Sequence, residues 1–159
     1  MKHILFVCSG NTCRSPLAEG IARLVLGGEP ELEVVVSSAG TSAVEGVAAS
    51  SHSIAVAGEH GIDIGDHEAR LLSSALVRDS DLIVTMGERH RETVGAIDPD
   101  ALAYTFLLTS FSGEHDGDVP DPIGGSEPLY QDTYDLMHSC IVALALAVAL
   151  PEFEGWKKS

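Results

Sequence analysis

The sequence predicts an α/β fold in which parallel strands alternate with helices, and three observations lead to this prediction. Short apolar runs typical of buried parallel strands recur along the chain. Segments with apolar residues at helical spacing separate these runs. With 159 residues, of which 45% are hydrophobic, the chain can bury one substantial core but is too short for two ordinary domains. We therefore expect one domain, residues 1–159.

Four segments are predicted as strands because each is a short, nearly continuous apolar run. They are Ile4–Val7, Val34–Val36, Leu82–Met86 and Leu102–Leu107. The polar segments Ser37–Ser53 and Ser110–Ser126 are predicted as long loops, which are often functional in compact domains. In an open parallel sheet, ligands bind beyond the carboxyl ends of the strands. The segment that follows the first strand, starting at Cys8, is therefore the first candidate site.

The first helix is expected directly after that segment. Ser15 is its predicted N-cap, Pro16 suits the first helical position, and Gly27-Gly28 is a stop signal. The last helix is predicted from the apolar face of Tyr134–Val148. Its most apolar part, Ile141–Leu150, is shorter than the roughly 18 to 20 apolar residues that cross a membrane. We expect a helix of the core, and no membrane partner.

The amino-acid composition limits which binding partners and which cellular compartment we expect. The chain has 9 Lys and Arg residues and 24 Asp and Glu residues. The resulting acidic surface repels nucleic acid, which is therefore not an expected partner. Cys8, Cys13 and Cys140 are too few for a disulfide framework, and no secretory signal is recognisable at the N-terminus. We therefore expect a cytoplasmic protein. The histidines lack metal-ligand spacing, so no metal is expected.

The segment Cys8–Pro16 has the residues of a phosphate-binding loop between a strand and a helix. Its middle residues are Ser9, Gly10, Asn11, Thr12 and Cys13. Inward-facing N–H groups and the helix dipole attract an anion at such a place, and Gly10 and Asn11 tolerate unusual backbone conformations. Arg14 presents a planar fork of donors that matches two phosphoryl oxygens. These surroundings favour the thiolate of Cys8, which is the expected nucleophile.

A cysteine nucleophile that attacks phosphorus also needs an acid to protonate the leaving group. Asp121 is the candidate because it stands between two prolines, in a long loop just before the last helix. Asp116 and Asp118 compete with it on chemistry alone.

These motifs resemble those of the low-molecular-weight protein-tyrosine phosphatases. The resemblance covers nearly the whole chain and rests on the Cys8–Arg14 loop with Ser15-Pro16, on Asp121-Pro122, and on Ser38–Thr41, His67, Arg70, Asp81–Val84 and Met86. A cysteine loop near the N-terminus paired with a distant Asp-Pro is far more specific than either motif alone. The resemblance implies a doubly wound, flavodoxin-like fold with a four-stranded parallel sheet. It also implies a phosphorylated protein substrate, a phosphocysteine intermediate and no cofactor.

The resemblance also implies roles for individual residues. It selects Asp121 among the competing carboxylates, first as proton donor and then as the base that activates water to hydrolyse the phosphocysteine. Ser15 is expected to hydrogen-bond the thiolate of the nucleophile. Asn11, Ser42 and His67 match residues that brace the loop.

The family contains a bacterial branch, the protein-arginine phosphatases, which carries threonine where tyrosine phosphatases usually have an aliphatic loop residue. Thr12 stands at that position. Tyrosine-specific members tend to have two aromatic residues after Asp-Pro, whereas this chain has Ile123 and Gly124. Without them a phosphotyrosine ring loses stacking worth about 1 kcal/mol, while the Thr12 hydroxyl can pair with a guanidinium nitrogen. We favour phosphoarginine over phosphotyrosine, although arginine-specific members have phenylalanine where Ile123 stands.

Two other functions and one regulatory role remain as alternatives. Arsenate reduction on the same fold needs relay cysteines downstream, and only Cys140 lies there, in an apolar helix. A phosphocarrier or phosphate-binding module would need no leaving-group acid such as Asp121. Cys13 either traps oxidised Cys8 in a disulfide or simply fills the base of the loop.

Overall fold

The computed structural model describes all 159 residues and contains one parallel sheet of four strands. The strands are β1 (Lys2–Cys8), β2 (Val34–Gly40), β3 (Leu82–Thr85) and β4 (Thr105–Leu107). They lie in the order β2-β1-β3-β4. This arrangement confirms the predicted α/β class and the doubly wound, flavodoxin-like topology.

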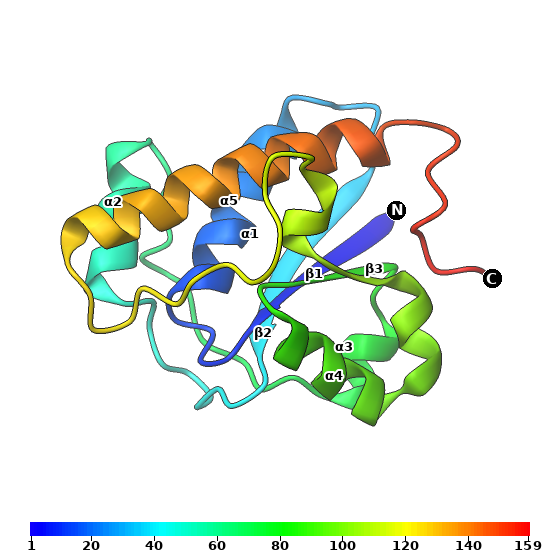
Figure 1. The fold of residues 1–159 in the computed structure, drawn as a ribbon, viewed down its shortest axis with the longest axis horizontal. Coiled ribbons are helices and arrows are strands. Elements are labelled where there is room, and N and C mark those ends of the chain that lie inside the picture. The colour runs from blue at the N-terminus through cyan, green and yellow to red at the C-terminus, as the bar shows by residue number, and fades with distance from the viewer.

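Helices cover both faces of the sheet (Figure 1). One face carries α1 (Arg14–Gly27), α2 (Ser51–Glu59) and α5 (Glu127–Val148), and the other carries α3 (Ser74–Arg78) and α4 (Glu88–Ile97). Two 3₁₀ helices, η1 (Pro99–Tyr104) and η2 (Leu108–Phe111), flank β4. None of the helices combines the length and the apolarity that crossing a membrane requires.

The central strand β1 supplies side chains to both hydrophobic cores. Ile4, Phe6 and Cys8 point into the core under α1 and α5, whereas Leu5 and Val7 point into the core under α3 and α4. Side chains alternate along a strand, and a strand covered on both faces is therefore apolar at consecutive positions. This double burial explains why β1 is recognisable in the sequence as a continuous apolar run.

The strand order places the candidate site. From β1 the chain returns through α1 to β2 on one side, and β3 pairs with the other side of β1. The strand order therefore reverses at β1, and a crevice forms beyond the carboxyl end of a strand at such a point. Cys8 is the last residue of β1.

Two predicted segments differ from the structure. Ser37–Gly40 continues β2 instead of opening the loop, because these residues pair with β1 up to the Cys8–Gly40 pair. The predicted strand at Leu102–Leu107 is a strand only from Thr105 onwards. The residues before it belong to η1, in whose first turn the side chain of Asp98 caps the backbone and Pro99 provides a fixed φ.

The first helix begins one residue before the predicted N-cap. Its N-cap is Cys13, which makes no side-chain capping bond, and Ser15 lies inside the first turn. The prediction that Ser15 caps the helix is therefore wrong, because its hydroxyl has another partner, the sulfur of Cys8. The end of the helix at Gly27, followed by Gly28, agrees with the predicted stop.

Gly40 allows β2 to approach the loop that follows β1. A Cβ atom at this position would lie 2.5 Å from the carbonyl oxygen of Ser9 and 2.9 Å from the backbone nitrogen of Asn11. Both atoms belong to the backbone, so no side-chain rotation relieves the contact. A side chain at residue 40 therefore displaces either the strand end or the loop.

We predict that Gly40→Ala lowers the free energy of unfolding by about 1 to 3 kcal/mol, the usual cost of overpacking. Gly58→Ala is the matched control, because a Cβ atom at Gly58 in α2 meets nothing within 4 Å. Alanine is the better helix former there, so the control should gain about 0.5 to 1 kcal/mol. Urea unfolding of both variants measures the difference. Equal stability of Gly40→Ala and the wild type would contradict the close approach.

Candidate active site

Residues 9–13 form a tight loop between β1 and α1, and Asn11 determines its shape. Asn11 is fully buried and has a φ of 56°, as the only residue other than glycine with positive φ. Its Nδ2 donates to Oγ of Ser15 at 2.8 Å and to Oγ of Ser38 at 3.0 Å. Its Oδ1 accepts the backbone N–H of Arg70 at 2.9 Å. Asparagine tolerates the left-handed backbone and satisfies all three contacts.

The sulfur of Cys8 lies at the base of this loop and is 2% exposed. The backbone N–H of Asn11 donates to it at 3.3 Å, and Oγ of Ser15 lies 2.9 Å away. A thiolate only accepts hydrogen bonds, so the Ser15 hydroxyl is the donor when Cys8 is ionised. The structure thus brings together the expected nucleophile and the expected hydrogen-bond donor.

Behind the loop, His67 and Glu19 support Asn11. Nε2 of His67 donates to the carbonyl oxygen of Asn11 at 2.7 Å, and its Nδ1 lies 3.7 Å from Oε2 of Glu19. Burial raises the pKa of the Glu19 carboxyl. The nearby ring of His67, the charge of Arg23 and the hydroxyl of Ser38 together outweigh burial. The net pKa therefore lies below the ordinary 4.5, and Glu19 is a carboxylate at neutral pH.

Ser38 and Ser42 contact the surroundings of the loop in different ways. Ser42, which was expected to brace the loop, contacts it through its backbone N–H, which donates to the carbonyl oxygen of Ser9 at 2.9 Å. The hydroxyl that reaches Asn11 belongs to Ser38, for which no role was predicted. Ser38 lies within β2 and pairs with Phe6 of β1. A buried polar residue inside a strand of the sheet was the available signal.

Arg14 connects the loop to the segment that carries Asp121. Its guanidinium is nearly buried, and Nη1 donates to the carbonyl oxygen of Val119 at 3.0 Å. Its Nη2 lies 3.5 Å from Oδ2 of Asp121, whose side chain is 41% exposed. The predicted phosphate clamp and the predicted acid are therefore neighbours, although they lie more than a hundred residues apart in the sequence.

The competing carboxylates have other surroundings. Oδ1 of Asp118 accepts the backbone N–H of Glu88 at 2.9 Å, in the first turn of α4. Asp118 also packs so closely on Gly87 that a Cβ atom there would lie 2.8 Å from its carboxyl carbon. Asp116 lies in a separate hollow beside β4. Only Asp121 is both next to Arg14 and free of a helix-capping contact.

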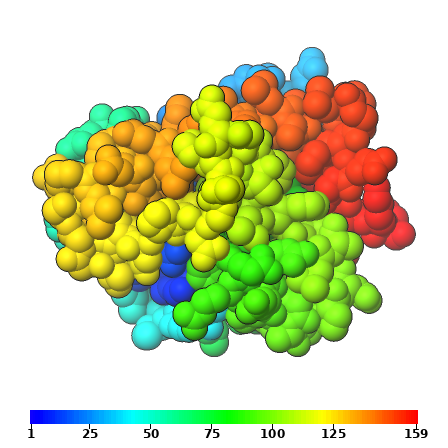
Figure 2. Space-filling model, viewed as in Figure 1, coloured from blue at the N-terminus to red at the C-terminus, as the bar shows by residue number.

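A pocket opens at this end of the sheet. Figure 2 shows the blue atoms of the N-terminal segment at the bottom of a hollow, between the yellow segment before α5 and the green α4. No Phe, Tyr or Trp side chain lines the pocket, and most lining residues are polar or charged. They are Ser9, Arg14, Thr41, Ser42, Gly87, Arg89, His90, Glu92, Thr93, Ala96, Asp118, Val119, Pro120 and Asp121.

The predicted specificity residues Thr12 and Ile123 are not among the lining residues. Oγ1 of Thr12 has only a weak partner, the sulfur of Cys13 at 3.8 Å, and the residue is half-buried at the rim of the loop. Ile123 is 67% exposed. Gly10 does not adopt the left-handed backbone conformation, and Asn11 is the only residue of this loop that does.

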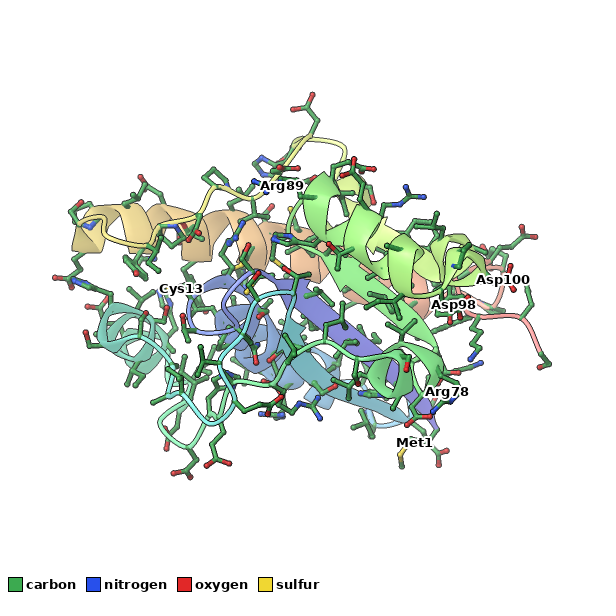
Figure 3. All side chains as sticks on the ribbon, turned by 90° about the horizontal axis from the view of Figure 1, so that it is seen from below. Met1, Cys13, Arg78, Arg89, Asp98 and Asp100 are labelled. Atoms are coloured by element: carbon green, nitrogen blue, oxygen red, sulfur yellow. The ribbon has the colours of Figure 1, made fainter.

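Cys13 lies where the loop meets α1 (Figure 3). Its sulfur contacts Oγ of Ser50 at 3.5 Å and the hydroxyl of Tyr130 at 3.4 Å. Burial, followed by the hydrogen bond to Cys13, raises the pKa of Tyr130. Cys8, Cys13 and Cys140 are all unpaired. Whether oxidation joins Cys8 to Cys13 stays a prediction.

His90, for which no role was predicted, contacts the loop. Its Nε2 lies 2.9 Å from Oγ of Ser9, and its Nδ1 is buried without a partner. Burial lowers the pKa of His90 to about 4, and the charge of Arg14 adds to this effect. Asp118 and Asp121 act in the opposite direction. No local pattern around residue 90 indicates a contact with residue 9.

Known proteins resemble this chain along most of its length. Residues 3–151 match the family model described as Low molecular weight phosphotyrosine protein phosphatase. The low molecular weight protein-tyrosine-phosphatase Wzb of Escherichia coli (strain K12) is 38% identical over 136 residues, which are 86% of this chain and 88% of Wzb. The protein-arginine-phosphatase of Geobacillus stearothermophilus is 36% identical over 142 residues, which are 89% of this chain and 93% of that protein.

A solved structure of the YwlE arginine phosphatase has the same fold. It is a cysteine-to-serine mutant with a phosphorylated active site serine, and it superposes with a TM-score of 0.88 at 31% identity. The match covers 94% of this chain and 97% of that chain. Proteins similar to this chain are thus named for two substrates, tyrosine and arginine.

The surroundings of Glu19 lead to a pH-dependent prediction. A carboxyl group whose pKa is lowered in the folded state stabilises the fold above the pKa of the unfolded chain, and this contribution is lost as pH falls through the folded pKa. Glu19→Gln should therefore destabilise the protein at neutral pH, and the difference from the wild type should shrink below the ordinary value of 4.5. Chemical denaturation at a series of pH values measures it.

Glu59→Gln is the control, because it removes the same charge from an exposed position in α2. Any effect that comes only from the change in net charge should appear in both variants. A difference between Glu19→Gln and the wild type that stays constant across the acidic range would show that Glu19 is not held as a carboxylate by its neighbours.

Proposed function

The chain belongs to the low molecular weight phosphotyrosine protein phosphatase family, and we propose that it hydrolyses phosphorylated protein side chains through a phosphocysteine intermediate. One observation carries the proposal: Cys8, Arg14 and Asp121 converge at the carboxyl end of β1. A nucleophile, an oxyanion clamp and a proton donor are the groups that this reaction requires.

In the first step, the Cys8 thiolate attacks phosphorus and the bond from phosphorus to the leaving atom breaks. Arg14 and the N–H groups of residues 9–13 bind the phosphoryl oxygens, where negative charge accumulates in the transition state. Asp121, as the carboxylic acid, gives its proton to the leaving atom. The products of this step are phosphocysteine, the unphosphorylated side chain and the Asp121 carboxylate.

In the second step, the Asp121 carboxylate takes a proton from a water molecule that attacks phosphorus. The bond between sulfur and phosphorus breaks, inorganic phosphate forms and Cys8 leaves as a thiolate. The Ser15 hydroxyl, 2.9 Å from the sulfur, stabilises this departing thiolate. The phosphorylated active site serine of the related YwlE mutant supports a covalent intermediate at this position of the fold.

The substrate that we favour is phosphoarginine. The pocket has no Phe, Tyr or Trp side chain to stack on a phosphotyrosine ring, and its polar walls suit a guanidinium group. Thr12 has a hydroxyl without a strong partner at the loop rim, so it can accept a guanidinium N–H. Phosphotyrosine is the second candidate, because Wzb, a protein-tyrosine-phosphatase, is as similar to this chain as the arginine phosphatase is.

Two other reactions have less support. Arsenate reduction needs a downstream relay cysteine, and Cys140 is fully buried inside α5. A phosphocarrier needs no leaving-group acid, whereas Asp121 stands beside Arg14. The phosphatase reaction uses both of these residues.

The proposal also includes the setting of the reaction. The nucleophile must stay a free thiolate, which suits the reducing cytoplasm. The expected partner is a phosphorylated protein, and one phosphatase domain spans residues 1–159. The net charge of −15 disfavours nucleic acid as a partner.

We predict that Asp121→Asn slows substrates with poor leaving groups by about 10²- to 10⁴-fold, the usual effect of losing a general acid. Substrates with good leaving groups should slow less, because they depart without protonation. Asp118→Asn is the matched control, since its amide oxygen can still accept the Glu88 N–H. The rates of an alkyl and an aryl phosphate measure both effects. A slower Asp118→Asn variant would identify Asp118 as the acid.

We predict that Thr12→Ile shifts the preference from phosphoarginine towards phosphotyrosine by about tenfold in the ratio of kcat/KM values. The aliphatic branch leaves a guanidinium N–H unpaired and adds apolar surface beside a ring. Two peptides of the same sequence, one with each phosphorylated residue, measure the ratio. Cys8→Ser serves as the blank for activity that does not depend on the nucleophile. A shift of less than about threefold would remove Thr12 as the selector.

A further inference from the structure

Ser9 is the loop residue whose side chain reaches the wall of the pocket. It follows the nucleophile directly, is half-buried and lines the pocket together with Arg14 and Asp121. Its Oγ contacts Nε2 of His90, in the first turn of α4, at 2.9 Å. The ring of His90 is nine-tenths buried, with the residue 6% exposed. The pair therefore joins the loop to α4 at the edge of the pocket.

The unpaired ring nitrogen of His90 identifies which atom carries the proton. Because the pKa of His90 is lowered to about 4, the ring is neutral at pH 7 and carries one N–H. Nδ1 is buried without a partner, and a buried N–H without an acceptor is rarer than a buried acceptor without a donor. The proton therefore belongs on Nε2, which donates to Oγ of Ser9.

We propose that Ser9 is a specificity-determining residue for phosphoarginine and that His90 is its positioning residue. This inference rests on the proposed phosphatase function. With one lone pair occupied by the N–H of His90, the Ser9 hydroxyl has one lone pair and its own proton available. Both are available to a bound substrate, because Ser9 lines the pocket.

A hydroxyl held in this way matches the bond between phosphorus and nitrogen. Phosphoarginine presents a phosphoryl oxygen, which accepts, next to guanidinium N–H groups, which donate. Ser9 gives its proton to the first and accepts from the second. Phosphotyrosine has only acceptor oxygens there, followed by an apolar ring. Binding it removes the water that donates to the free lone pair of Ser9, and the substrate offers no donor in place of that water.

The position of His90 is fixed by two contacts between the start of α4 and the residues just before Pro120 and Asp121. The carboxylate of Asp118 accepts the N–H of Glu88, two residues before His90. The backbone N–H of Val119 donates to the carbonyl oxygen of Met86 at 2.7 Å. The start of α4 therefore moves with the segment that carries Asp121. Figure 3 shows Arg89, the neighbour of His90, where α4 begins beside that segment.

The test compares Ser9→Ala, His90→Phe and the double variant on phosphoarginine and phosphotyrosine peptides of the same sequence. Each single variant should lower the ratio of kcat/KM for phosphoarginine to kcat/KM for phosphotyrosine by about tenfold, because both substrates lose the hydrogen bond to the phosphoryl oxygen but only phosphoarginine loses the acceptor for its N–H. The double variant should lose no more activity on phosphoarginine than Ser9→Ala alone, because His90 acts through Ser9. His90→Gln, which can offer an N–H in place of Nε2, should recover most of the loss.

The control His138→Phe makes the same replacement at an exposed position of α5 and should change neither substrate. Equal losses on both peptides, or additive losses in the double variant, would overturn the inference while leaving the phosphatase function intact. Turnover that persists in Cys8→Ser would instead overturn the proposed function. A wild type that hydrolyses phosphotyrosine but not phosphoarginine would overturn the substrate and this inference together.

A second measurement needs no variant. The ¹⁵N chemical shifts of the His90 ring at about pH 7 distinguish the two neutral tautomers and the imidazolium. The neutral form with the proton on Nε2 is expected. The Nδ1-protonated form or the imidazolium would overturn the role of His90 as donor to Ser9.

Discussion

The buried side chain of Asn11, in a left-handed backbone conformation, holds the loop on which the site depends. Its amide joins three segments, because it contacts Ser15 in α1, Ser38 in β2 and the backbone of Arg70. A loop pinned in this way brings its own N–H donor to the sulfur of Cys8 and places the Ser15 hydroxyl beside it. Anion binding and thiolate stabilisation therefore require no rearrangement of the backbone.

The second constraint is the guanidinium of Arg14, which is buried and committed to two partners at once. It donates to the carbonyl oxygen of Val119 and lies beside Asp121, so the acid segment is attached to the phosphate loop. The same segment is tied to α4 through Asp118. The distance between the proposed nucleophile, Cys8, and the proposed acid, Asp121, is thus set by several contacts in a folded core, and such placement favours chemistry that uses fixed groups instead of mobile ones.

The proposed catalytic groups would act on a phosphate ester and on a phosphoramidate alike, so in this proposal selection between the two substrates comes from Thr12 at the loop rim and from the pocket walls. These walls are mostly polar and contain no Phe, Tyr or Trp. Of the loop residues between Cys8 and Arg14, only Ser9 is part of them, and its hydroxyl is held by His90. A substrate preference in this fold therefore depends on α4 as well as on the loop that carries the nucleophile.

The family resemblance, and not the residues alone, indicated Asp121 as the expected acid, whereas the sequence by itself determined the α/β class and the loop from Cys8 to Arg14 as the candidate site. These features are local: a buried strand is a run of apolar residues, and an anion loop is a contiguous set of residue types. Only the tertiary structure decided that Ser15 lies inside α1 instead of capping it, that the hydroxyl of Ser38 reaches Asn11, and that His90 reaches Ser9. Each of these contacts joins side chains whose positions depend on how strands and helices pack. Spacing along the chain describes one element at a time, and the contact between residues 9 and 90 exists only because β1 and α4 meet at the same edge of the sheet.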